Sequence, residues 1–182
     1  MKIELEQVSP HEIEKRSFEI ITEELNGRTF PEDQELVVKR CIHTSADFDY
    51  ADNLCFSEHA VAKGIEAIRE GACIVTDTQM ARSGINKKVL ARHGGEALCF
   101  MSAVGNAPTA LVRLYELIGE GKIKPALIIG VPVGFVNVVQ SKELIMQTNI
   151  PYIVARGRKG GSNIAACICN ALLYMMDQDR GY

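Results

Sequence analysis

The sequence predicts an α/β protein with a three-layer α/β/α arrangement around a mostly parallel central sheet. Short apolar runs of strand length alternate with helical patterns in the C-terminal part of the chain. Such runs are typical of strands buried on both faces of a parallel sheet, and the helices provide the right-handed crossovers between them. The runs cover residues 72–76, 97–104, 126–131 and 152–155, and the helical patterns cover residues 108–119, 141–148 and 162–177.

The N-terminal part of the chain is predicted to be helical. Ser9 and Glu12 form a capping-box pattern before a helix at residues 11–26. A second helix carries residues 36–47, an irregular or extended link follows at residues 48–56, and a third helix covers residues 57–70. We predict one domain over residues 1–182, in which the helical part, residues 1–71, packs on the α/β part, residues 72–182.

The composition excludes several classes of protein. The 182 residues are 47% hydrophobic and carry a net charge of −3, so the chain has no overall basic field for nucleic acid. The longest apolar run, residues 126–136, is interrupted by glycine and proline and is too short to span a membrane. The N-terminus lacks an apolar signal core, which predicts a cytoplasmic protein. The six cysteines form no Cys-x-x-Cys pair, so we expect reduced, buried thiols and no metal site.

His43 is the candidate proton donor or acceptor. Two cations within one helical turn disfavour the protonated imidazole, whereas the C-terminal end of the helix favours it. This balance is suited to proton transfer near neutral pH. A surface or half-buried histidine with a purely structural role is the alternative. The helix face concerned contains Leu36, Lys39, Arg40, His43 and Ala46.

The turns that follow three of the predicted strands have the composition of ligand-binding loops. Residues 156–162, with the sequence RGRKGGS, combine three cations, a glycine-rich backbone and a helix N-terminus. These features favour a carboxylate or phosphate, and a solvated basic loop is the alternative. The turns at 105–109 and 130–136 would lie at the same carboxyl edge of the sheet. Neither a Gly-x-Gly-x-x-Gly nor a Walker-type motif is present, so the pattern indicates a large polyanion rather than a nucleotide.

Taken together, segments along nearly the whole chain resemble the precorrin-8X methylmutases, also called precorrin isomerases. No single segment is specific for the family, but the occurrence of all of them in this order is. The matching segments are residues 13–18 (IEKRSF), 40–43 (RCIH), 76–80 (TDTQM), 83–85 (SGI), 105–111 (GNAPTAL), 130–136 (GVPVGFV), 141–142 (SK) and 156–162 (RGRKGGS).

The resemblance implies an isomerase of cobalamin biosynthesis. Such an enzyme moves a methyl group between neighbouring ring-C carbons of precorrin-8X or cobalt-precorrin-8 and gives hydrogenobyrinate or cobyrinate. The family's catalytic histidine matches His43, which would give a proton to the ring system. No added cofactor is implied, and cobalt would arrive only within the substrate. The implied substrate-binding residues are Arg16, Ser17, Arg40, Asp77, Ser83, Asn106, Gly134, Phe135, Arg156, Arg158 and Ser162.

A homodimer is expected on two grounds. The family forms homodimers, and residues 164–176 are apolar on nearly every face of the predicted last helix, so a partner subunit would cover them.

The chain departs from the family between Phe100 and Ala103, where members usually carry a further helix and part of a strand. Two other functions stay open. A corrinoid-binding protein would need the cationic turns but no titrating histidine. An unrelated α/β enzyme acting on a phosphorylated metabolite would need a base and a phosphate loop in one site.

Overall fold

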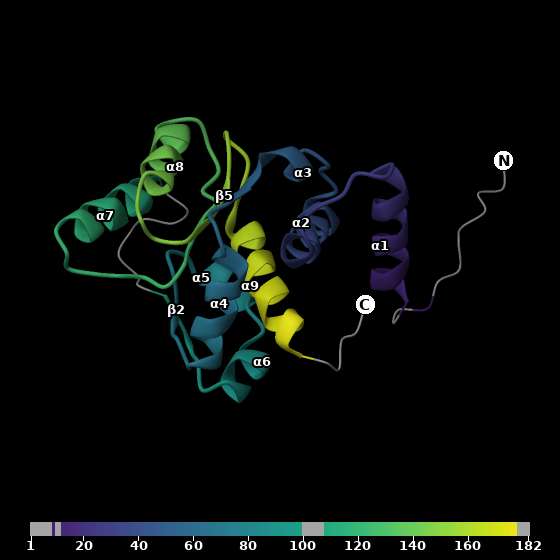
Figure 1. The fold of residues 1–182 in the computed structure, drawn as a ribbon, viewed down its shortest axis with the longest axis horizontal. Coiled ribbons are helices and arrows are strands. Elements are labelled where there is room, and N and C mark those ends of the chain that lie inside the picture. Colours follow the sequence, from purple (N-terminus) through teal and green to yellow (C-terminus); the bar gives the residue numbers. More distant parts are fainter. Residues whose placement is uncertain (1–8, 10–11, 100–107, 178–182) are drawn as a thin grey trace.

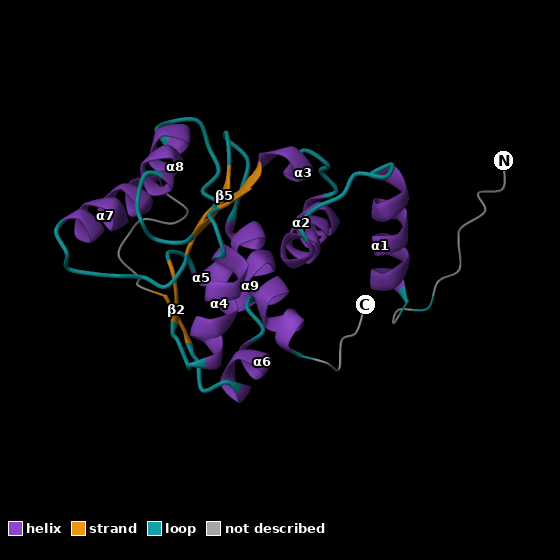
Figure 2. Cartoon of the chain, in the orientation of Figure 1, coloured by secondary structure: helices purple, strands orange, loops and turns teal. Residues whose placement is uncertain are grey.

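The computed structural model describes residues 9, 12–99 and 108–177 of the chain, and it confirms the predicted α/β class (Figures 1 and 2). Most of the strands are short, at three residues each. The described elements are α1 (Ile13–Glu24), α2 (Glu32–Ser45), α3 (Tyr50–Asn53), β1 (Leu54–Phe56), α4 (Ala60–Arg69), β2 (Ile74–Thr76), α5 (Gln79–Gly84), α6 (Lys87–Arg92), β3 (Ala97–Cys99), α7 (Pro108–Gly119), β4 (Ile128–Gly130), α8 (Val138–Met146), β5 (Tyr152–Ala155) and α9 (Ser162–Met176).

The described strands form two small sheets, whereas the sequence predicted a single one. β5 lies in the middle of the order β1-β5-β4, parallel to β4 and antiparallel to β1. β2 and β3 form a separate parallel pair in which Val75 lies beside Leu98. The predicted link at residues 48–56 instead contains α3 and β1. β1 is hard to predict because its partner, β5, lies about 100 residues further along the chain.

Helices cover both faces of the β1-β5-β4 sheet. Successive side chains of β5 point to opposite faces of the sheet and belong to two different apolar cores. Ile153 and Ala155 belong to the apolar core shared with α2, α4 and α9. Val154 belongs to a second core formed with Leu111 of α7 and Ile145 of α8. Figure 2 shows α7 and α8 on one side of β5, with α9 and α4 on the other. The carboxyl ends of β4 and β5 therefore lie between two layers of helices.

The last helix, α9, is buried by the chain itself. Its apolar face packs against α2, α4 and α5, so the sequence-based reason for a covering partner subunit was wrong. Asn170, the one strongly polar side chain between Ile164 and Met176, accepts a hydrogen bond from the Asn86 amide at 2.7 Å and donates one to the Gly84 carbonyl at 2.8 Å. Through these two hydrogen bonds the half-buried Asn170 amide connects α9 to the end of α5 and the start of α6.

Several element boundaries differ from the sequence prediction. α1 begins at Ile13, and the Ser9 hydroxyl donates to the Glu12 carboxylate at 2.6 Å instead of capping the helix. α4 begins at Ala60, because the Ser57 hydroxyl accepts a hydrogen bond from the Tyr152 amide at 2.9 Å. α8 covers Val138–Met146 rather than residues 141–148, and α5 and α6 were not predicted.

The cysteines follow the prediction in part. Cys41, Cys167 and Cys169 are buried thiols, whereas Cys73 is exposed. No helix in the described ranges is both long enough and apolar enough to cross a membrane.

The loops after β4 and β5 pack directly against each other. The Gly161 amide donates to the Val131 carbonyl at 2.8 Å, and the Gly134 amide donates to the Arg158 carbonyl at 3.2 Å. Gly160 lies at the closest approach, with φ +155°, and a Cβ atom there would be 2.1 Å from the Val131 carbonyl oxygen. Only glycine fits this position, because both the conformation and the space exclude a side chain.

We predict that Gly160→Ala lowers the free energy of unfolding by at least about 2 kcal/mol, since the substitution combines backbone strain with a clash against backbone. Urea denaturation followed by circular dichroism measures the change. Gly119→Ala is the matched control, because a Cβ atom at Gly119 meets no atom within 4 Å. Equal stabilities of the Gly160→Ala variant and the wild type would contradict the prediction.

Candidate functional site

His43 lies in the last turn of α2, with its imidazole exposed. The ring lies 5.8 Å from that of Phe18 on α1, at an interplanar angle of 34°. α2 ends at Ala46, which adopts a left-handed conformation, and the chain then turns into Asp47. A titratable side chain is thus presented to solvent at a fixed helix end, as a proton donor requires.

The two cations near His43 are each paired with a carboxylate. The Lys39 ammonium contacts the Glu35 carboxylate at 2.5 Å. The Arg40 guanidinium contacts the Glu14 carboxylate at 2.9 Å and lies over the rings of Phe18 and Tyr174. From the sequence, both cations were predicted to act on the imidazole, and Arg40 was predicted to bind substrate. In this structure Arg40 is only 7% exposed and joins α1, α2 and α9.

The cationic turn at residues 156–161 is anchored to the end of α2 through Lys159. Its ammonium donates to Asp47 at 2.6 Å and to Asp49 at 2.5 Å. These hydrogen bonds raise the pKa of Lys159, and the bond to Lys159 lowers the pKa of Asp47. Lys159 is therefore engaged with the segment that follows His43, and it places the turn beside the helix end that carries the imidazole.

The same turn is anchored to α8 through Lys142. This side chain is 1% exposed, and its ammonium donates to the carbonyls of Gly157 at 2.9 Å and Lys159 at 2.8 Å. Burial lowers the pKa of Lys142 to about 8. At the start of the turn, the Arg156 amide donates to the Asn53 carbonyl at 2.7 Å. The turn is therefore held from Asn53 of α3, from Lys142 of α8 and, through the Lys159 side chain, from the segment that follows α2.

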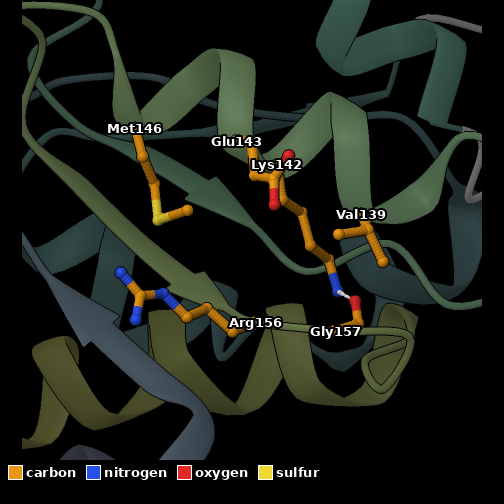
Figure 3. A pocket seen from close by; sticks show the side chains of 6 residues that line it. All are labelled: Val139, Lys142, Glu143, Met146, Arg156 and Gly157. Atoms are coloured by element: carbon orange, nitrogen blue, oxygen red, sulfur yellow. Dashed lines mark hydrogen bonds between the residues drawn. The ribbon is translucent and has the colours of Figure 1, made fainter.

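Arg156 and Arg158 are the two exposed cations of the turn, and they point in different directions. Arg158 lies over the ring of Phe135, with its guanidinium carbon 5.2 Å from the ring centroid. Phe135 is 81% exposed and belongs to the loop that contains Gly134. The Arg156 side chain instead lines a pocket with residues of α8 (Figure 3). Arg158 and Phe135 thus form a platform that is open to solvent.

The pocket beside Arg156 is small, with a volume of about 120 Å³. Pockets that enclose drug-sized ligands are about 300–1,000 Å³, so a tetrapyrrole does not fit inside this one. A substituent of a larger ligand does fit. The lining residues are Val139, Lys142, Glu143, Met146, Arg156 and Gly157.

The segment after β2 joins the same edge through Ser162, the first residue of α9. The Ser162 and Thr78 hydroxyls are 2.8 Å apart, and Thr78 also caps α5 by accepting from the Ala81 amide at 3.1 Å. Asp77 and Ser83, which flank this contact in sequence, are exposed. Thr78 was not among the predicted site residues, although its position before a helix is typical of an N-cap.

Of the remaining predicted substrate-binding residues, Arg16 and Ser17 make polar contacts within α1. The Arg16 guanidinium contacts the Glu19 carboxylate at 3.4 Å, and the Ser17 hydroxyl donates to the Ile13 carbonyl at 2.8 Å. Both side chains are half-buried on the α1 helix, which carries Phe18. Asn106 lies outside the described residues. Within the described ranges, no three histidine, cysteine, aspartate or glutamate side chains gather in a way that would hold a metal ion.

Comparisons with known proteins identify the family. The model of the precorrin-8X methylmutase family matches residues 12–104 and 101–175. A cobalt-precorrin-8 methylmutase of Priestia megaterium is 39% identical, and the alignment covers 96% of this chain and 92% of that protein. One of Salmonella typhimurium is 40% identical, with 91% and 95% covered.

This chain belongs to the precorrin-8X methylmutase family. Members of the family are isomerases that shift a methyl group within a corrin precursor during cobalamin biosynthesis. The structure of a precorrin-8X methylmutase from Thermus thermophilus superposes with a TM-score of 0.85 at 35% identity, over 90% of this chain and 96% of that one.

The comparisons also locate where this chain differs from its relatives. The two matched segments meet at residues 101–104, and the alignment with the Priestia protein spans 207 positions, more than the 182 residues of this chain. Relatives therefore contain residues that have no counterpart here. The junction lies outside the described residues, at the place where the sequence analysis found the chain to be short.

Proposed function

We propose that this chain catalyses the methyl shift between neighbouring ring-C carbons of cobalt-precorrin-8, giving cobyrinate. Membership of the methylmutase family carries the proposal, together with an exposed imidazole at the expected position of the sequence. The names of the Priestia and Salmonella relatives include cobalt, which favours the cobalt-containing substrate over precorrin-8X and its product hydrogenobyrinate.

His43 is the proposed proton donor. The methyl group breaks its bond to one ring carbon and forms a bond to the neighbouring one, so the macrocycle keeps all its atoms. A proton given to the ring system by the imidazolium favours the rearranged arrangement of double bonds. The ring then returns one proton to the imidazole or to water, so that substrate and product have the same composition. Histidine is suited to this role because its protonation changes near neutral pH. No other reactant is needed, so we propose that the enzyme uses no added cofactor and that cobalt is part of the substrate alone.

The substrate carboxylates are proposed to bind at the cationic turn. Arg158 is exposed, and its guanidinium can form paired hydrogen bonds with a carboxylate. Phe135 offers an apolar surface beside it for the macrocycle. The pocket at Arg156 is large enough for a single side arm of the ring. Asp77, Ser83 and Ser162 are proposed to contact the substrate from the segment after β2.

A homodimer would complete this open site. Phe135 and Val136 are 81% and 77% exposed, and a macrocycle lying on them would have one face in water unless a second chain covers it. We therefore propose a cytoplasmic homodimer with its sites near the interface. Light scattering should give twice the chain mass of 20.0 kDa at micromolar concentration, and a monomer would contradict the proposal.

The direct test is the absorption spectrum of cobalt-precorrin-8 incubated with the protein. Conversion changes the conjugated system and therefore the spectrum of the released corrin. A protein that only held corrinoids would return the substrate unchanged. Unaltered pigment after extraction from stoichiometric protein would refute the methylmutase activity.

We predict that His43→Ala lowers turnover by about 10²–10⁴-fold, as expected for the loss of a general acid. Substrate affinity should change little, because the carboxylates bind elsewhere. Stopped-flow absorbance and equilibrium titration measure the two quantities. His93→Ala, on the distant α6 side of the molecule, is the control. Turnover at the wild-type rate would remove His43 from the mechanism.

We also predict that Arg156→Ala and Arg158→Ala each weaken substrate binding by about 1.5–3 kcal/mol, the value of hydrogen bonds to charged groups. Added salt should weaken binding by the wild type as well. Arg113→Ala is the matched control, because Arg113 is an exposed arginine that pairs with Glu116 on α7. Affinity that is independent of salt and of both substitutions would exclude the turn as the carboxylate site.

A further inference from the structure

Lys142 is a buried cation to which the proposed reaction gives no role. In the described residues its ammonium contacts no carboxylate, and its two hydrogen-bond acceptors are the backbone carbonyls of Gly157 and Lys159. Burying a charge is costly unless that charge is well satisfied. A methionine would fill the same space without this cost, so packing alone does not explain a lysine here.

The charged and titratable groups around Lys142 do not neutralise it. Glu143 and Arg156 line the same pocket, and together they carry no net charge (Figure 3). Lys159 directs its own ammonium away, to Asp47 and Asp49, and offers Lys142 only its carbonyl. The ammonium of Lys142 therefore acts on the peptide groups of the turn rather than on an ion-pair partner.

The two accepting carbonyls lie on either side of Arg158. In a trans peptide the N–H group points opposite to the C=O group of the preceding residue. Drawing the Gly157 and Lys159 carbonyls toward α8 therefore turns the amides of Arg158 and Gly160 away from α8. Among the described residues, neither amide has a hydrogen-bond acceptor, whereas the neighbouring Gly161 amide is bonded to Val131.

We propose that Lys142 is a positioning residue that orients the Arg158 and Gly160 amides toward a carboxylate of the corrin precursor. The two amides and the Arg158 guanidinium would then converge on one anion, as in other backbone anion sites. The inference rests on the proposed function, since the ligand is taken to be a substrate carboxylate. It adds a residue that acts through the backbone of the turn, because its ammonium is bonded to the Gly157 and Lys159 carbonyls.

The test is Lys142→Met, with Lys63→Met on α4 as the matched control, because Lys63 is exposed. Hydrogen exchange of the peptide that covers residues 156–161 should become faster in Lys142→Met alone. With cobalt-precorrin-8, KM should rise about ten-fold, the effect of weakened hydrogen bonds to a charged group, while kcat stays within about two-fold. A residue that only stabilised the fold would not separate KM from kcat in this way.

Wild-type exchange and wild-type KM in Lys142→Met would overturn the proposal, and so would a lower kcat at unchanged KM. If Lys142→Met does not fold, Lys142→Gln keeps a neutral donor of similar shape and is judged by the same two measurements. If the wild type fails to convert cobalt-precorrin-8, the proposed function fails. The exchange measurement still decides whether Lys142 orders the turn, and titration with cobyrinate decides whether the ordered turn binds a carboxylated corrin.

Discussion

The fixed backbone of residues 156–161 is the constraint on which the candidate site depends. Without contacts to the rest of the chain, a glycine-rich turn with three cations would sample many conformations, and its positive charges would repel one another. Here its carbonyls bond to Lys142, its Lys159 ammonium bonds to Asp47 and Asp49, and its glycines pack on the loop after β4. Helix α8 and the segment that follows α2 are thereby joined through one turn.

Some cations of the site pair with carboxylates of the chain, whereas others are available to bind a ligand. Lys39, Arg40 and Lys159 all pair with carboxylates, so much of their charge is compensated within the chain. Arg158 instead lies over an exposed aromatic ring. Electrostatic attraction for a substrate with many carboxylates therefore concentrates at the carboxyl edge of β4 and β5, even though the net charge of the chain is negative.

Local patterns predicted the longer helices, with α7 at its observed bounds, because capping residues and apolar periodicity act within a few residues, but they missed the short helices α3, α5 and α6. They did not predict β1 or the separation of the sheet into two, because strand pairing depends on residues far apart in the chain. The same limit applies to the site. The basic turn was evident in the sequence, but the pairing of Arg40 with Glu14 and the burial of Lys142 against the turn are tertiary contacts. Asn170 was evident as an isolated polar residue, and only the structure gives its partners.

The central claim is that His43 and the cationic turn serve one substrate, although they belong to elements that only the fold brings together. The most direct test is a crystal structure of the protein with bound cobyrinate. The account predicts ring C within about 2.6–3.2 Å of the His43 imidazole, directly or through one water, and at least one carboxylate on Arg158. A corrin bound away from either group would contradict the account.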